Sequence, residues 1–191
     1  MIRPPRLILE LVETLLLTLL IFFVIQTFVA QPFQVEQSSM EHTLEPGQFV
    51  LVDKLSPRWD TYHRGDIVVL RPPLGWEDQG DTPFVKRVIG LPGDRIEIRD
   101  NGIVYVNGAP LDETAYTYRN ADGKNAPTTP LTGTSTWTLG PDQLFVMGDH
   151  REASSDSRAF GPIDVASVIG RAFLRYWPAT TFGILGAPAY H

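Results

Sequence analysis

Two serines in the first third of the chain could supply a nucleophile. Residues 36–44 read EQSSMEHTL and place Ser38 and Ser39 side by side in a loop before an expected strand. A serine hydroxyl becomes a nucleophile where a neighbouring base removes its proton. A serine pair alone is more often part of a hydrogen-bonded linker, so this segment indicates catalysis only together with a base.

Lys86 is the residue that could act as that base. It lies in residues 84–89, which read FVKRVI. A lysine in such an apolar strand either reaches water from a sheet edge or is buried. Burial disfavours the ammonium form and lowers the pKa, and the neutral amine can then accept a proton from serine. Serine proteases with lysine in place of histidine use this chemistry.

A third polar segment, residues 148–162, reads GDHREASSDSRAFGP. Its charged residues could pair with one another in a solvated loop, or they could support a site. Each of the three segments alone is weak evidence. Their order along the chain is specific: Ser-Met first, then a lysine in the strand before Gly-Leu-Pro-Gly-Asp, then Gly-Asp-x-Arg-x-x-Ser-x-Asp-Ser-Arg.

The composition excludes several other kinds of site. The chain has no cysteine, which removes thiolate nucleophiles and cysteine-bound metal centres. The four histidines show no metal-ligand spacing, and no glycine motif for a dinucleotide or a phosphate is present, so we expect no metal and no cofactor. A net charge of -6, without a basic cluster after Arg6, argues against a nucleic-acid partner.

The chain of 191 residues predicts one mainly β domain built on an antiparallel sheet. Sixteen glycines and sixteen prolines imply frequent turns and short strands. Residues 95–106 predict a hairpin, because alternating apolar residues flank an Asp-Asn-Gly turn, and a second turn at Asn107-Gly108 is expected to close it. Residues 110–137 lack periodicity and predict a polar excursion or small subdomain. Further strands are expected at residues 48–53, 65–70, 84–89, 143–147 and 168–177.

Residues 7–30 are nearly all apolar and long enough to cross a bilayer as a helix. Arg3 and Arg6 precede this span, whereas the next basic residue is Lys54, so the basic bias places the N-terminus in the cytoplasm. A cleaved secretory signal is the alternative, but its apolar core is shorter and VAQPF is a poor cleavage site. We therefore expect an uncleaved single-pass anchor.

These features divide the chain into two parts. Residues 1–30 form a short cytoplasmic N-terminus and the membrane anchor. Residues 31–191 form an extracytoplasmic domain, in which the polar excursion covers about residues 100–140.

The three polar segments, in this order behind an N-terminal span, resemble the sequence boxes of the bacterial type I signal peptidases from about residue 7 to residue 178. The resemblance implies a Ser-Lys protease domain of that family in the cytoplasmic membrane, acting on translocated preproteins beside membrane lipid. It implies cleavage of signal peptides after small residues in an Ala-x-Ala pattern. Ser39 corresponds to the nucleophile, Lys86 to the base and Ser154 to a serine that orients the lysine amine. The charged residues expected to support the site are Asp149, Arg151, Asp156 and Arg158.

The chain departs from the family pattern at three positions. Gln37 stands where many members have serine or a small residue, which leaves the Ser39 N–H as the assured oxyanion donor. His42 replaces a proline, and His150 stands where asparagine is common. Neither histidine is expected to be the base, because no G-x-S-x-G elbow exists and Lys86 fills that role.

Two other interpretations remain open. A related Ser-Lys protease could serve a single pilus or conjugation protein. A membrane-tethered β domain could also bind a partner without catalysis, and the serines and lysine would then be structural.

Overall fold

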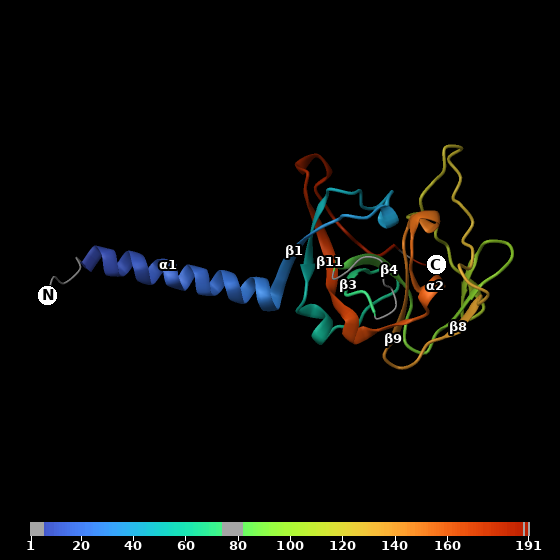
Figure 1. The fold of residues 1–191 in the computed structure, drawn as a ribbon, viewed down its shortest axis with the longest axis horizontal. Coiled ribbons are helices and arrows are strands. Elements are labelled where there is room, and N and C mark those ends of the chain that lie inside the picture. The colour runs from blue at the N-terminus through green and yellow to red at the C-terminus, as the bar shows by residue number, and fades with distance from the viewer. Residues whose placement is uncertain (1–5, 74–81, 189, 191) are drawn as a thin grey trace.

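The computed structural model describes residues 6–73, 82–188 and 190, which form a long helix attached to a β domain (Figure 1). Helix α1 spans Arg6–Val24 and continues as a π-helical turn, η1, over Ile25–Val29. None of the side chains of α1 is buried. The segment Arg6–Val29 is therefore long and apolar enough to cross a membrane, and its apolar surface lies outside the β domain.

The main sheet has eight antiparallel strands, in the order β1-β2-β11-β3-β4-β9-β10, with β12 paired to β11. Strand β4 lies between β3 and β9, and all seven of its residues are buried. The bounds are β1 Ala30–Gln34, β2 Phe49–Asp53, β3 Ile67–Leu70, β4 Phe84–Gly90, β9 Gln143–Met147, β10 Ile163–Asp164, β11 Val168–Trp177 and β12 Gly183–Ile184.

The five strands predicted from apolar runs in this sheet are confirmed as β2, β3, β4, β9 and β11, within two residues at each end. The short strand β1 was not predicted, because the expected span ran through Ala30. In the structure, Ala30 already pairs with Asp53 of β2. The sheet therefore begins directly where the helix ends.

A second sheet has the order β7-β6-β5-β8, with β5 at Arg95–Ile98, β6 at Val104–Val106, β7 at Ala109–Pro110 and β8 at Thr136–Thr138. The predicted hairpin is confirmed as β5 and β6, and its turn uses Gly102 at φ 74°. The second turn, at Asn107-Gly108, lies where it was expected, with φ values of 53° and 85° that suit a tight two-residue turn. The Asn107 N–H donates to the Arg95 carbonyl at 2.8 Å and closes the hairpin, and the same turn leads from β6 into β7.

The two sheets share one apolar cluster. Ile89 and Phe145 of the main sheet pack in it with Ile96 and Val104 of the second sheet. Gly90 ends β4 at this junction, and a β-carbon there would lie 2.6 Å from Leu139 Cδ1. A larger residue would force the sheets apart, so the glycine permits their close packing.

Short helical turns connect the strands. Two of them, η2 and η4, come together, because the His150 N–H directly before η4 donates to the Ser39 carbonyl in η2 at 3.0 Å. This contact joins the two polar loops that the sequence singled out. The turns are η2 Ser38–Met40, η3 Ser56–Arg58, η4 Arg151–Ala153, α2 Ser157–Phe160, η5 Val165–Ser167 and η6 Ala179–Thr181.

Candidate active site

Ser39 lies in the middle of η2, the single turn that follows β1. Gln37 enters this turn in an extended conformation, and the Glu41 N–H closes it on the Ser38 carbonyl at 3.0 Å. Met40 is buried in the core of the main sheet and anchors the turn. As a result Ser39 is only 3% exposed, and its hydroxyl is directed into the protein rather than into solvent.

Lys86 lies on β4 with 1% of its surface exposed, so the buried interpretation of this lysine holds and the edge interpretation does not. Its Nζ donates to Ser39 Oγ at 2.7 Å, and both groups are buried. The aromatic ring of Phe84 lies 5.2 Å from the amine. The structure thus brings together the two residues predicted as nucleophile and base, which are 47 positions apart in the sequence.

Burial changes the acid-base chemistry of this lysine. Desolvation lowers the pKa of Lys86 from 10.5 to about 8, and the nearby Asp156 carboxylate partly opposes this effect. The Arg158 guanidinium lowers the same pKa further. Near neutral pH most of the amine is still protonated, but its neutral fraction is far larger than that of an exposed lysine, and this neutral amine can take the Ser39 proton.

Gly148 brings the third polar segment against the serine turn. A β-carbon at this position would lie 2.4 Å from the Ser39 carbonyl oxygen and 2.3 Å from Ser154 Oγ. Real β-carbons do not approach other atoms so closely, so the site requires glycine here. The sequence motif that begins with this residue therefore has a steric origin at its first position.

Ser154 does not make the contact expected from the family resemblance. Its hydroxyl is buried and forms no hydrogen bond within the described residues, so it does not hold the Lys86 amine. It lies close enough to the Asp156 carboxylate to help lower that group's pKa, after the larger effects of burial and of Arg158. The Ser154 side chain lies directly beside Gly148.

The supporting charged residues are buried, which rules out a solvated loop. Asp149 accepts two hydrogen bonds from Arg87, at 2.8 and 2.6 Å, and a third from Thr43 at 2.6 Å. The charge and hydrogen bonds of Asp149 outweigh the desolvation of Arg87 and raise the pKa of that guanidinium. Arg87 also donates to the Gly65 carbonyl at 2.8 Å. This pair ties β4 to Thr43, which follows η2, and to Gly65, which precedes β3.

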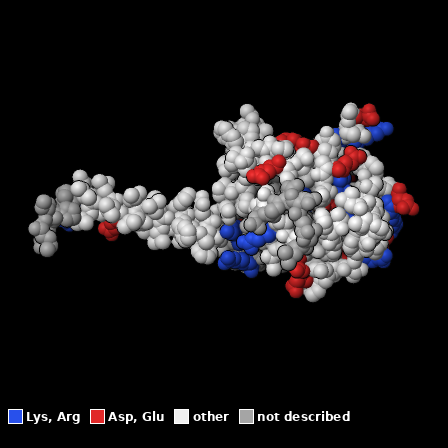
Figure 2. Space-filling model, viewed as in Figure 1, with Lys and Arg blue, Asp and Glu red and all other residues white. Residues whose placement is uncertain are grey.

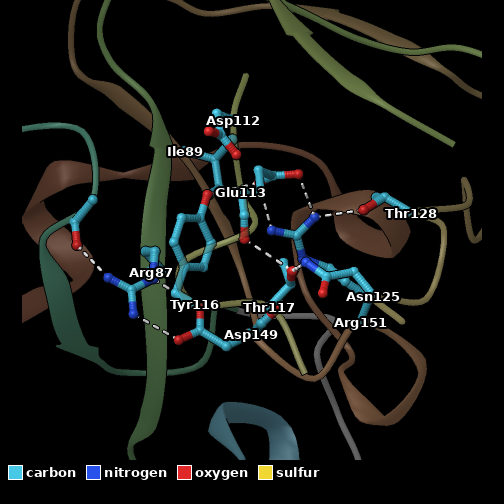
Figure 3. A network of polar contacts seen from close by, with 12 residues as sticks. Arg87, Ile89, Asp112, Glu113, Tyr116, Thr117, Asn125, Thr128, Asp149 and Arg151 are labelled. Atoms are coloured by element: carbon cyan, nitrogen blue, oxygen red, sulfur yellow. Dashed lines mark hydrogen bonds and ion pairs between the residues drawn. The ribbon is translucent and has the colours of Figure 1, made fainter. Parts of the chain in front are cut away.

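Arg151 links the same loop to the polar excursion (Figure 3). Its guanidinium donates to both oxygens of Glu113, at 2.8 and 2.6 Å, and also to Thr128. Its Nε donates to the Gly148 carbonyl at 2.9 Å. The excursion is therefore fastened directly to the residue that packs against Ser39.

Asp156 and Arg158 form the third buried pair, at 2.8 and 2.9 Å. Burial alone would raise the pKa of Asp156, but the hydrogen bonds and charge of Arg158 outweigh it and lower the pKa overall. Asp156 also accepts the Gly148 N–H at 3.0 Å, and Arg158 donates to the carbonyls of Arg151 and Ser154. Buried ion pairs and hydrogen bonds of the four charged residues therefore stabilise the conformation of the loop over residues 148–162.

Several members of this network were not identified from the sequence. Arg87 follows Lys86 in an apolar strand and could have been noticed as a second buried cation. Glu113 and Tyr116 lie in the excursion, where no periodicity marks them. The Tyr116 ring lies 4.3 Å from the Arg87 guanidinium, and its hydroxyl donates to Glu113 at 2.8 Å, so it separates the two arginine pairs (Figure 3). Burial raises the pKa of Tyr116 and keeps the phenol protonated.

Neither histidine near the serine occupies the position of a base. His42 is exposed at φ 84°, and its backbone N–H donates to Glu45. The His150 ring stacks on Tyr118 with a centroid distance of 3.9 Å, and its Nδ1 lies 2.7 Å from Glu41 Oε2. The His150 ring is therefore engaged by Glu41 and Tyr118, while the Ser39 hydroxyl is bonded to Lys86.

A small pocket opens beside the serine. It is lined by Val35, Glu36, Gln37, Ser39, Met40, Pro83 and Val85, and its accessible volume is about 10 Å³. That is about the space of one water-sized sphere. In the described part of the chain, no group of three or more histidine or carboxylate side chains is arranged to hold a metal ion.

Comparisons with known proteins identify the family. The model of the family "Signal peptidase, peptidase S26" matches residues 8–177. A probable signal peptidase I-1 of Synechocystis is 36% identical over 96% of this chain and 90% of its own length. Signal peptidase IB of Staphylococcus aureus is 32% identical over 92% of both chains.

Among solved structures, a signal peptidase I from Enterococcus faecalis is similar at 32% identity, with a TM-score of 0.44, over 58% of this chain and 95% of that one. The family assignment follows from the sequence matches alone, which extend over nearly the whole chain. The chain belongs to the peptidase S26 family of signal peptidases, which are serine endopeptidases.

Proposed function

We propose that this chain is a membrane-anchored serine endopeptidase that removes signal peptides from exported preproteins, with Ser39 as nucleophile and Lys86 as general base. The observation that carries the proposal is the 2.7 Å hydrogen bond between Lys86 Nζ and Ser39 Oγ, formed where both residues are buried. The lowered pKa of the amine supports the same assignment.

In the first half of the reaction, the neutral Lys86 amine accepts the Ser39 proton as the hydroxyl oxygen attacks the scissile carbonyl. The tetrahedral intermediate then collapses, the peptide C–N bond breaks, and the ammonium group donates its proton to the leaving amine. An ester between Ser39 and the signal peptide remains. In the second half, the neutral amine takes a proton from water as the water oxygen attacks the ester carbonyl. The bond between the carbonyl carbon and Ser39 Oγ then breaks, the ammonium returns its proton to Oγ, and the signal peptide leaves with a free carboxylate.

The oxyanion of these intermediates needs donors. The Ser39 N–H belongs to the same turn as the nucleophile and is the first donor that we assign. Gln37 lines the pocket beside Ser39, so its amide is the second candidate. The small volume of this pocket supports cleavage after small residues, as in an Ala-x-Ala pattern, because larger side chains would meet Val35, Met40 and Val85.

We propose a single-pass topology in the bacterial cytoplasmic membrane. Residues 1–30 are the cytoplasmic N-terminus and anchor, and residues 31–191 are the catalytic domain on the outer side, with the excursion at about residues 100–140. The apolar segment Arg6–Val29 supports the anchor, and the early basic residues support the orientation. A substrate held in the same bilayer would present its cleavage site close to Ser39, which follows the span by ten residues (39 − 29).

The decisive experiment incubates the detergent-purified full chain with a preprotein that carries an Ala-x-Ala site, in the presence of EDTA. We expect one cleavage product, because the proposed mechanism uses no metal. Ser39→Ala should abolish the product, whereas Ser38→Ala serves as a matched control that keeps it. Cleavage by the Ser39 variant, in a preparation free of host peptidase, would contradict the proposal.

The same assay separates the alternatives. A protease for one pilus or conjugation protein would cut that protein and leave general preproteins intact. A non-catalytic binding domain would cut neither, although it would remain folded.

A further inference from the structure

Backbone pairing fixes which end of the main sheet adjoins the apolar helix. Strand β1 starts at Ala30 and pairs with β2 so that Ala30 faces Asp53. One residue further, the Lys54 N–H donates to the Val29 carbonyl at 2.9 Å. Val29 is the last residue of the apolar segment. The chain that follows β2 therefore lies at the level where the helix leaves the domain.

Basic side chains gather at this end. Lys54 and Arg58 lie before and within η3, and Arg71 follows β3. Strands β2 and β3 both run antiparallel to β11, so their C-terminal ends point the same way. Figure 2 shows Lys and Arg atoms grouped where the helix joins the domain.

These cations have no carboxylate partner among the residues that the structure describes. Within residues 6–73 and 82–188, none of the three has a carboxylate within ion-pair distance, and the Lys54 amine reaches only the Gln31 amide oxygen at 3.3 Å. The nearby Asp60 carboxylate pairs with Arg171 instead. Within the described residues, the positive charge of these three side chains is therefore not neutralised by an ion pair.

An exposed aromatic residue accompanies the charge. Trp59 follows Arg58 directly, and 72% of its surface is exposed. Indole side chains are enriched at the level of lipid headgroups, where the ring contacts acyl carbon and the N–H remains hydrated. Trp59 lies near Lys54 and Arg58 in the sequence, at the end of the domain that adjoins the apolar span, and such a combination of residues is typical of a surface that contacts lipid headgroups.

We propose that Lys54, Arg58, Arg71 and Trp59 form a docking surface for anionic phospholipid headgroups in the leaflet next to the domain. The inference rests on the proposed membrane anchorage. The chain carries a net charge of -6 and would be repelled by an anionic surface, but cations within one Debye length of that surface, about 8 Å, reverse the local interaction. Docking would fix the tilt of the domain and the height of Ser39 above the bilayer.

The test uses the full chain reconstituted in vesicles. Because the sequence has no cysteine, Thr61→Cys introduces a single site for a spin label beside the surface. We compare its accessibility to a water-soluble relaxation agent in vesicles of phosphatidylcholine alone and of phosphatidylcholine with phosphatidylglycerol. We expect protection of the label in the anionic vesicles, and loss of that protection in 1 M salt.

Charge removal provides the matched comparison. Lys54→Gln with Arg58→Gln should lower the ratio of protected to accessible label about fivefold for each residue. Arg119→Gln with Lys124→Gln removes the same charge from exposed positions in the excursion and should leave the ratio unchanged.

Three outcomes would overturn the proposal. The label could be equally accessible in both kinds of vesicle, the two double variants could behave alike, or the patch variant could change only the association of copies with one another. A failure of the anchorage itself looks different, because the wild-type chain would then not float with vesicles of either composition.

Discussion

Gly148 approaches Ser39 so closely that a β-carbon on the glycine would lie 2.4 Å from the serine carbonyl oxygen. The same glycine accepts a hydrogen bond from Arg151 and donates one to Asp156. The serine turn and the charged loop are therefore in direct backbone contact. The position of the proposed nucleophile depends on a residue that has no side chain.

Gly148→Ala should lower kcat by about 10²-fold, because the added methyl group must displace the serine turn by a fraction of an ångström or more. Gly133→Ala is the control, since a β-carbon there has no atom within 4 Å. Steady-state cleavage of a preprotein measures both. Equal rates for the two variants would show that the contact does not position Ser39.

Lys86→Ala and Lys86→Arg should both abolish cleavage while the domain stays folded. Alanine removes the amine, and arginine keeps a charge that it cannot release at physiological pH. In the wild type, kcat/KM should rise with pH through about 8, since the base is active only after it loses its proton. Substantial turnover by the arginine variant would exclude Lys86 as the base.

The same lysine should reduce the stability of the domain. Its pKa is about 8 in the folded chain and near 10.5 when exposed, so the unfolded chain binds more protons and stability rises with pH between these values. At pH 7 the full cost applies, roughly 3 kcal/mol. Lys86→Met should therefore raise the melting temperature at pH 7, and the gain should disappear above pH 10.5. A gain independent of pH would contradict this account.

The sequence predicted the strands well, because apolar runs between glycine and proline turns are local signals that define β2, β3 and β4. The Ser39–Lys86 pair was expected from the order of three segments and their resemblance to a family, since a lysine in an apolar run can also lie at a sheet edge; the structure brings the two residues into contact. The expected hydrogen bond between Ser154 and Lys86 is absent, since the Ser154 hydroxyl has no hydrogen-bond partner within the described residues. A sequence motif does not specify side-chain geometry at this precision.

The partners of the charged loop could not be predicted from the sequence. Asp149 pairs with Arg87, 62 positions away, and Arg151 pairs with Glu113, 38 positions away. Several nearby residues of opposite charge were equally plausible partners. Only the packing of the excursion against β4 selects these pairs, and no local pattern records that packing.

Gln37→Ala tests the second oxyanion donor. If the amide stabilises the developing charge, kcat should fall by ~10²–10³ with little change in KM, because the interaction strengthens only in the transition state. Gln37→Asn shortens the side chain and should restore little activity. An unchanged kcat in the alanine variant would leave the backbone N–H of Ser39 without this partner.

His150 and Glu41 should act together as positioning residues rather than in proton transfer from Ser39. The imidazole Nδ1 donates to the carboxylate at 2.7 Å, and the His150 backbone N–H holds the Ser39 carbonyl, so the pair braces the serine turn from its outer side. His150→Gln and Glu41→Gln should each lower kcat on the order of tenfold, about 1.4 kcal/mol, with KM nearly unchanged. The double variant should lose no more activity than the worse single variant, because both substitutions break the same contact.

Melting temperatures measured in parallel would separate this effect from loss of fold. If His150→Gln were as inactive as Lys86→Ala, the imidazole would have a direct role in the proton transfer, and additive losses in the double variant would show that the two residues act separately.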